Sequence, residues 1–210
     1  LVIAIHGWGG RAGQMASVAR RVADEGFHVV IPQLPGHAGG AKTDIKESAE
    51  ALRSVVDEIG EPEMVVAHSF AALVLRLVYQ ESGPSKVVMV APALNVEDAL
   101  EVFGRRLRLL PWTQRGLRRR LRSWDPSLWP TVSQILPGQL EGTQVLIVHD
   151  PRDRETSFAG SAQLAAIRPA TSIVPLEGAG HSRILSDPRT LDQVAGFLRG
   201  DRVSDESSAA

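Results

Sequence analysis

Residues 65–72 have the sequence VVAHSFAA, in which an apolar strand pattern passes directly into a helical pattern at a single serine. Without a linker the chain must turn sharply at Ser69, and such a turn holds a hydroxyl above the end of the strand. This nucleophile elbow usually has the pattern G-x-S-x-G, because the strand and helix backbones pass closely there. Ala67 and Ala71 take the two glycine positions here. Alone, the motif also fits an ordinary helix with Ser69 as its N-cap.

Apolar runs that predict strands alternate with helical patterns along most of the chain. The predicted strands are residues 1–5, 27–31, 63–67, 86–91, 143–149 and 171–176, and the predicted helices are residues 14–25, 44–59, 70–81, 157–167 and 188–199. This order implies a mostly parallel sheet with helices on both faces. Ligands bind beyond the carboxyl ends of such strands, so the side chains that directly follow strands are the candidates for chemistry.

An acid and a base follow the last two predicted strands. Asp153 lies in HDPRD after the fifth strand, and His181 ends GAGH after the sixth. A serine hydroxyl needs a base to become nucleophilic, and the base needs an acid to orient it. The chain order Ser69, Asp153, His181 is the one expected for this sheet. Singly, Asp153 could be a turn residue and His181 a helix cap, and Asp150 is an alternative acid.

A glycine-rich turn, HGWGG at residues 6–10, follows the first predicted strand. A tetrahedral oxyanion needs preorganised N–H donors, and we expect the backbone N–H groups of Trp8 and Phe70 to supply them. The alternative is a phosphate-binding turn, which is disfavoured because G-x-G-x-x-G and G-x-x-x-x-G-K-[ST] are both absent. The histidines near strand ends lack metal-ligand spacing, so neither a metal nor a cofactor is predicted.

Together these segments resemble the α/β-hydrolase family over nearly the whole chain. The matching segments are HGWGG, LPGH at residues 34–37, AHSFA, HDPRD and GAGH. LPGH is similar to the family's D-x-P-G-H-G with Gln33 in place of the acid, and HDPRD is similar to H-G-x-x-D with Asp150 in place of the glycine. The resemblance implies an α/β-hydrolase fold and a carboxylic ester hydrolase, with Ser69 as nucleophile, Asp153 as acid and His181 as base.

The same three residues serve other reactions in relatives, so the bond that is cleaved stays open. The alternatives are hydrolysis of a C–C bond, a thioester, an amide or a lactone, or a non-catalytic binding protein on this scaffold. A small-molecule acyl compound is the expected substrate, and the sequence does not predict the oligomeric state.

Residues 95–142 interrupt the alternation and predict short helices, which by the family resemblance would form a cap over the active site. We therefore expect an α/β-hydrolase core at 1–94 and 143–200, a helical cap at 95–142 and a flexible tail at 201–210.

The predicted cap is strongly basic and carries three tryptophans. The stretch Arg105–Arg122 contains eight arginines and no acid. It could be a solvated helix face over an apolar acyl pocket, which we favour, or a surface that attracts an anionic membrane or an anionic ligand. Trp112, Trp124 and Trp129 are the candidate substrate-binding side chains.

The overall composition fits one globular domain. The chain has 210 residues, of which 43% are hydrophobic, and no cysteine, so disulfides and a cysteine nucleophile are excluded. The 23 basic and 24 acidic side chains give a net charge of −1, and no dedicated nucleic-acid module is present, so nucleic-acid binding is not expected. The near-neutral net charge hides two opposite contributions, because Arg105–Arg122 has a charge of +8 and the rest of the chain therefore has a charge of −9.

The ends of the sequence also carry expectations. No apolar run approaches the roughly 18 residues of a transmembrane helix, and residues 1–5 lack the basic start of a signal peptide, so we expect a cytoplasmic protein. The chain starts at Leu1, and members of the family carry two strands before the HG strand. We therefore expect a trimmed N-terminus or a minimal version of the fold.

Overall fold

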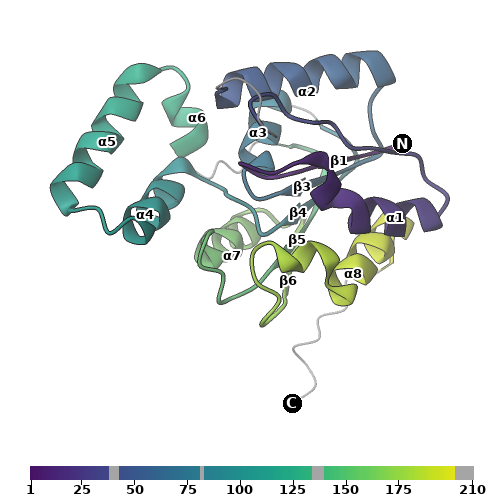
Figure 1. Cartoon of the computed structure of the whole chain (residues 1–210). Coiled ribbons are helices and arrows are strands. Elements are labelled where there is room, and N and C mark those ends of the chain that lie inside the picture. The colour runs from purple at the N-terminus through teal and green to yellow at the C-terminus, as the bar shows by residue number, and fades with distance from the viewer. Residues whose placement is uncertain (38–42, 81–82, 134–139, 202–210) are drawn as a thin grey trace.

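The computed structural model describes residues 1–37, 43–80, 83–133 and 140–201, and its centre is a six-stranded sheet (Figure 1). The strands are β1 (Val2–Ile5), β2 (Val29–Val30), β3 (Met64–His68), β4 (Lys86–Val90), β5 (Gln144–His149) and β6 (Thr171–Pro175). They lie in the order β2-β1-β3-β4-β5-β6, and every neighbouring pair is parallel. The predicted parallel α/β sheet is confirmed.

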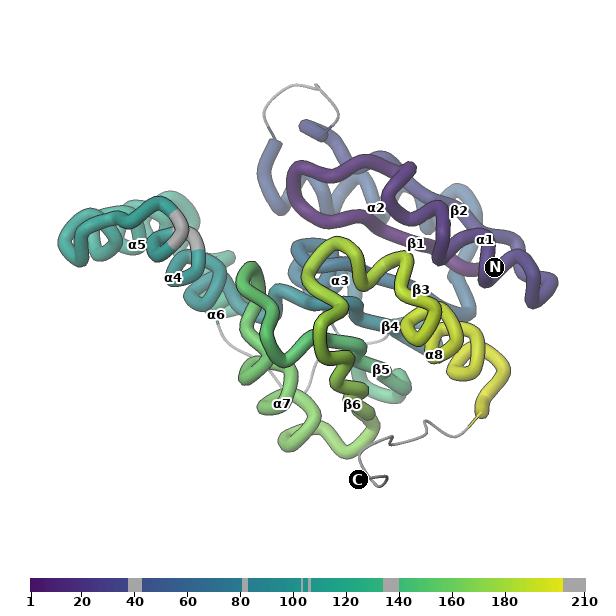
Figure 2. Tube along the Cα trace, turned by 60° about the horizontal axis from the view of Figure 1, so that its bottom comes forward, coloured from purple at the N-terminus to yellow at the C-terminus, as the bar shows by residue number. Residues whose placement is uncertain are grey.

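Helices cover both faces of this sheet, as Figures 1 and 2 show. They are α1 (Ala16–Asp24), α2 (Ile45–Ile59), α3 (Ala71–Val78), α7 (Phe158–Ile167) and α8 (Pro188–Arg199). The alternation of side chains along each strand divides the apolar residues between two cores. In β3, Val65 and Ala67 pack with α2, α3 and α7, whereas Met64 and Val66 pack with α1 and α8. Because both faces of the sheet are covered, the central strands β1, β3, β4 and β5 are buried and mostly apolar.

The chain reverses its direction of travel across the sheet between β1 and β3. From β1 it crosses to β2 at one edge, and it then returns past β1 to begin β3. Ligands bind at such a switch point, beyond the carboxyl ends of the two strands. The glycine-rich turn at 6–10 follows β1 and Ser69 follows β3, so both lie at this point.

Three predicted elements differ from the observed ones. The strand predicted at 27–31 is only two residues long, Val29–Val30, and this edge strand pairs with β1 alone and is half-buried. The helix predicted at 14–25 begins with a 3-10 turn, Ala12–Met15, before α1. The helix predicted at 70–81 corresponds to α3, which spans Ala71–Val78, and residue 81 lies outside the described residues.

The segment between β4 and β5 consists of helices. They are α4 (Val96–Arg106), α5 (Pro111–Trp124) and α6 (Trp129–Ser133), and the described residues of this segment contain no strand. Figures 1 and 2 show α4 and α5 standing out from the sheet. Part of the predicted cap, residues 134–139, lies outside the described residues, and so does the predicted tail beyond Asp201.

Polar side chains of the core hold these inserted helices. The buried guanidinium of Arg76 on α3 donates hydrogen bonds to the carbonyl of Leu94, just before α4, and to the carbonyl of Thr131 in α6. Lys46, in the first turn of α2, forms an ion pair with Asp125, which directly follows α5. The start of the inserted segment, α6 and the end of α5 are therefore each joined to helices of the core.

The turn between β3 and α3 has strained backbone at Ser69. Its φ is 53°, in the left-handed region that costs a non-glycine residue about 1–3 kcal/mol. Neighbouring backbone holds this conformation. The N–H of Ser69 donates to the carbonyl of Val90 at 3.0 Å, and the N–H groups of Ala72 and Ala93 donate to the carbonyl of Ser69 at 3.1 and 3.0 Å.

The turn at Ser69 also requires a residue without a side chain on the adjacent loop. A Cβ atom at Gly7 would lie 3.0 Å from Nδ1 of His68 and 3.0 Å from Cβ of Ser69. Ala67 and Ala71, which flank the turn, are completely buried. The small residues at the turn therefore lie in tightly packed surroundings.

Replacing Gly7 by alanine tests this close packing. We expect Gly7→Ala to lower the free energy of unfolding by about 1–3 kcal/mol, because His68 or the strained turn must move. The control is Gly13→Ala, since nothing lies within 4 Å of a Cβ atom placed there. Urea denaturation compares the two variants, and equal stabilities would contradict the close packing at Gly7.

Candidate active site

The structure brings Ser69, His181 and Asp153 into one chain of hydrogen bonds. The Oγ atom of Ser69 lies 3.0 Å from Nε2 of His181, and Nδ1 of His181 lies 2.8 Å from Oδ2 of Asp153. The three side chains come from the loops that follow β3, β6 and β5. Parallel strands end at the same edge of the sheet, and this is why residues so distant in sequence meet.

The Asp153 carboxylate is completely buried and accepts several hydrogen bonds. Besides His181, its Oδ2 atom has Thr156 Oγ1 at 3.0 Å and His149 Nε2 at 3.3 Å, and its Oδ1 atom accepts the N–H of Glu155 at 2.7 Å. Burial alone would raise the pKa of Asp153, but hydrogen bonds from His149, His181 and Glu155 hold it well below the ordinary value. The buried acid is therefore ionised.

His149 is a part of this site that the sequence did not reveal. The side chain is fully buried, and its Nδ1 atom lies 2.8 Å from Oγ of Ser161. If the Ser161 hydroxyl donates this bond, the proton of His149 sits on Nε2 and points to Asp153. The available signal was the spacing of His149 and Asp153, four residues apart in HDPRD.

Asp150, the alternative acid, has a different role. Its Oδ2 atom accepts the N–H of Gly180 at 2.6 Å and its Oδ1 atom accepts the N–H of Arg152 at 2.9 Å. Burial raises the pKa of Asp150, but these backbone donors outweigh it and lower the pKa overall. Asp150 thus fixes the loop that carries His181, and it is Asp153 that contacts the imidazole.

His68 contacts the backbone of His181. The Nε2 atom of His68 lies 3.0 Å from the carbonyl oxygen of His181. Burial, helped by the nearby His181, lowers the pKa of His68 to about 4, so the ring is neutral at physiological pH. A neutral ring that donates this bond holds the backbone of His181 in place.

His6 connects the glycine-rich turn to the loop that contains LPGH. Its Nε2 atom accepts the N–H of Leu34 at 3.2 Å and lies 3.0 Å from the side-chain nitrogen of Gln33. The side-chain oxygen of Gln33 in turn accepts the N–H of Ala12 at 2.9 Å. Burial lowers the pKa of His6. The glutamine that replaces the family's acidic residue thus takes part in holding these two loops together.

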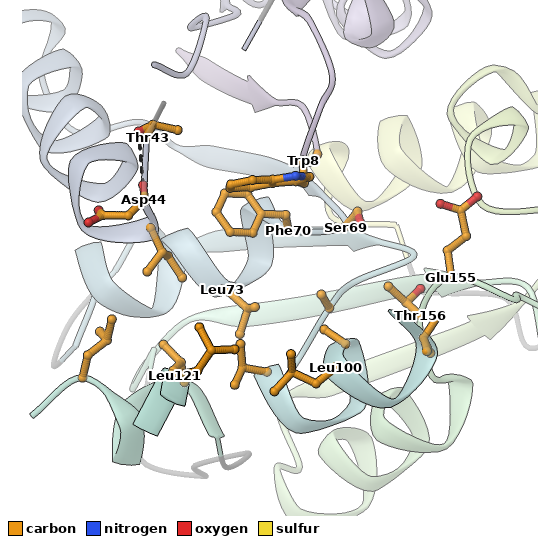
Figure 3. A pocket seen from close by; sticks show the side chains of 18 of the residues that line it. Trp8, Thr43, Asp44, Ser69, Phe70, Leu73, Leu100, Leu121, Glu155 and Thr156 are labelled. Carbon is orange, nitrogen blue, oxygen red and sulfur yellow. Dashed lines mark hydrogen bonds between the residues drawn. The ribbon is translucent and has the colours of Figure 1, made fainter. Parts of the chain in front are cut away.

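Trp8 and Phe70, the predicted oxyanion donors, lie beside Ser69 (Figure 3). Their rings pack edge to face, with centroids 5.0 Å apart. Within the described part of the chain, neither backbone N–H group donates a hydrogen bond to another protein group.

Ser69 opens into a cavity of about 790 Å³ between the core and the inserted helices. Its walls are largely apolar and include Leu73, Val96, Ala99, Leu100, Leu117, Leu121, Leu128 and Val132. Figure 3 shows Ser69, Trp8 and Phe70 on one side, opposite Leu100 and Leu121. Among the predicted substrate-binding tryptophans, Trp124 and Trp129 line the cavity, whereas Trp112 is not part of its wall and is 63% exposed.

The described residues contain no group of three or more histidine, cysteine or acidic side chains arranged to hold a metal ion. In that same part of the chain, no helix combines the length and apolar character needed to cross a bilayer.

A family model described as "Alpha/beta hydrolase family" matches residues 2–194. The chain belongs to this family. The match covers nearly the whole chain, as does the resemblance of its motifs, and the parallel sheet with helices on both faces is the α/β-hydrolase fold.

Solved structures with the same fold include several alpha/beta hydrolases of low sequence identity. The Est1E protein of Butyrivibrio proteoclasticus, solved with ferulic acid bound, has a TM-score of 0.70 and 16% identity, with 95% of this chain and 88% of that chain covered. The esterase EaEST of Exiguobacterium antarcticum has a TM-score of 0.67 and 13% identity, with 94% of this chain and 91% of that chain covered. A bromoperoxidase of Bacillus anthracis has a TM-score of 0.65 and 13% identity, with 95% of this chain and 91% of that chain covered. No curated protein sequence matches the chain significantly.

The ionised Asp153 makes the stability of this alpha/beta hydrolase depend on pH. Its pKa in the folded protein is depressed, so its stabilising contribution is present above the unfolded-state pKa of about 3.9 and is lost as the pH falls below it. We expect Asp153→Asn to lower the free energy of unfolding by about 1–3 kcal/mol at pH 7, and this difference should shrink below about pH 4.

Urea denaturation between acidic and neutral pH measures this difference. Asp57→Asn is the control, because Asp57 is exposed on α2, away from the cavity. A difference between wild type and Asp153→Asn that stays constant over the whole pH range would contradict the assignment of Asp153 as the buried charge.

Proposed function

We propose that the protein is a serine hydrolase that cleaves carboxylic esters through an acyl-enzyme. One observation carries the proposal. Ser69 lies in the wall of an apolar cavity, and a chain of hydrogen bonds runs from it through His181 to the buried Asp153. In this arrangement a hydroxyl, a base and an orienting acid meet where a substrate has room to bind.

The proposed reaction begins when Ser69 Oγ bonds to the ester carbonyl carbon and its proton moves to Nε2 of His181. Asp153 holds the Nδ1 proton and stabilises the imidazolium that forms. The oxygen of the tetrahedral intermediate carries a negative charge, and the N–H groups of Trp8 and Phe70 are the proposed donors to it. Collapse of this intermediate expels the alcohol oxygen, which takes the proton from His181.

The acyl-enzyme is then hydrolysed by the same groups. A water molecule gives one proton to His181 and bonds through its oxygen to the acyl carbon. The second intermediate collapses, Ser69 Oγ leaves with the proton from His181, and the carboxylic acid is released. His181 thus acts in turn as base and acid in both halves of the cycle.

The apolar cavity favours a small or medium uncharged acyl group. Apolar side chains from α3, α4 and α5 surround the space next to Ser69. We propose that residues 95–142 act as a cap over the core formed by 1–94 and 143–200, and that Trp124 and Trp129 contact the substrate. The same catalytic chain could cleave a thioester, an amide, a lactone or a C–C bond, and a substrate panel separates these reactions.

Removing the nucleophile tests the proposal directly. We expect wild type to hydrolyse p-nitrophenyl esters and Ser69→Ala to lose at least about three powers of ten in kcat, because the covalent route is removed. A fluorophosphonate probe should label wild type and leave Ser69→Ala unlabelled. Equal ester hydrolysis by both proteins, or absence of labelling in folded wild type, would overturn the assignment of Ser69.

Filling the cavity tests where the acyl group binds. Ala99 on α4 lines the cavity, so we expect Ala99→Trp to lower kcat/KM for an octanoate ester by about tenfold relative to an acetate ester. Ala162→Trp on α7 is the control, because Ala162 is exposed and is not part of the cavity wall. An unchanged preference for chain length in Ala99→Trp would place the acyl group elsewhere.

A further inference from the structure

One surface of the inserted helices combines exposed apolar and basic side chains, and the proposed reaction gives it no role. This surface, named here the hairpin face, comprises Leu107, Arg108 and Leu110 of the turn between α4 and α5 with Trp112, Arg115, Arg119 and Arg120 of α5, all solvent-exposed. It belongs to the part of the molecule that stands out from the sheet in both Figure 1 and Figure 2.

The two sides of α5 are chemically different. A helix turns by about 100° per residue, which places Trp112, Arg115 and Arg119 on one side. Leu117 and Leu121 lie on the opposite side and line the cavity. Changes on the hairpin face therefore do not alter the cavity wall.

The apolar part of the hairpin face is unusually exposed. Leu107, Leu110 and Trp112 are 54%, 52% and 63% exposed, although they lie within six consecutive positions. Large apolar side chains gathered in this way indicate a surface that contacts another molecule or a membrane.

The charges around the hairpin face are distributed asymmetrically. Glu97 of α4 forms ion pairs with Arg118 and Arg122, and Glu101 forms one with Arg105. These acids therefore neutralise arginines that lie outside the hairpin face.

The arginines of the hairpin face have no such neighbours. None of Arg108, Arg115, Arg119 and Arg120 forms an ion pair with any described residue. The face itself contains no acidic side chain. It therefore presents uncompensated positive charge beside exposed leucine and tryptophan.

We propose that the hairpin face binds the surface of a lipid bilayer that contains anionic phospholipids. Guanidinium groups pair with lipid phosphates, an indole ring favours the headgroup level, and leucine side chains enter the boundary of the acyl chains. The complementarity of both charge and apolar surface selects this partner. Trp112, which the sequence suggested for substrate binding, is assigned here to the membrane contact.

Co-sedimentation of the whole protein with vesicles tests the proposal. We expect binding to vesicles of phosphatidylcholine mixed with phosphatidylglycerol, weaker binding as salt is added, and little binding to phosphatidylcholine alone. One arginine near an anionic surface strengthens binding by about fivefold, so Arg115→Gln with Arg119→Gln should weaken it by at least about tenfold. Trp112→Ala should also weaken it.

The matched control is Arg11→Gln with Arg20→Gln, which removes the same charge from exposed positions outside the inserted helices. An equal loss of binding in this control, or equal binding to neutral and anionic vesicles, would overturn the proposal. So would self-association in sedimentation velocity that Trp112→Ala abolishes while vesicles are not bound, or binding to duplex DNA without binding to vesicles. Ser69→Ala should bind vesicles like wild type, so this test is independent of the proposed esterase activity.

Discussion

The Asp153 carboxylate is a charge without contact to solvent, and much of the site follows from the donors it requires. A buried ionised acid is unstable unless hydrogen bonds replace the lost water. They come from His181 in the loop after β6, from His149 at the end of β5, and from Thr156 and the N–H of Glu155 in the loop after β5. The same bonds that keep the acid ionised therefore fix the orientation of the imidazole toward Ser69.

A second constraint is the strained turn at Ser69. The left-handed conformation is unfavourable in isolation, and it persists because backbone from β4 and the loop after it bonds to both sides of the serine. The close approach of Gly7 leaves no room for a side chain on the neighbouring loop. These two constraints meet at the carboxyl edge of the sheet, so the backbone around Ser69 and the proposed oxyanion donors is held in place by contacts within the protein.

The sequence predicted the parallel sheet, and it identified Ser69, Asp153 and His181 as candidate site residues because each follows an apolar strand. Parallel strands place their carboxyl ends at one edge of the sheet, so the sequence predicts that the three side chains lie at the same edge. His149 and Thr156 were not found, because a buried hydrogen-bond partner leaves no periodic pattern in a sequence. Their contacts depend on how the loop after β5 folds back over Asp153.

Other differences between prediction and structure have physical causes as well. β2 ends at Val30, and Pro32 shortly after it has no N–H group with which to extend the pairing with β1. The excess of arginine in the inserted segment is partly neutralised by Glu97 and Glu101, since α4 packs against α5 and brings the acids to Arg118, Arg122 and Arg105. The sequence predicted that Trp112, Trp124 and Trp129 all bind substrate, but Trp112 lies on the side of α5 that faces away from the cavity.

The inserted helices are joined to the core by polar groups as well as by apolar packing. Arg76 holds the carbonyls of Leu94 and Thr131 at the base of the segment. Lys46 and Asp125 form an ion pair at the wall of the cavity, next to the apolar side chains of α5. Since α5 lines the cavity with one side and presents the hairpin face with the other, the ion pair of Lys46 with Asp125 fixes the position of both surfaces relative to the core.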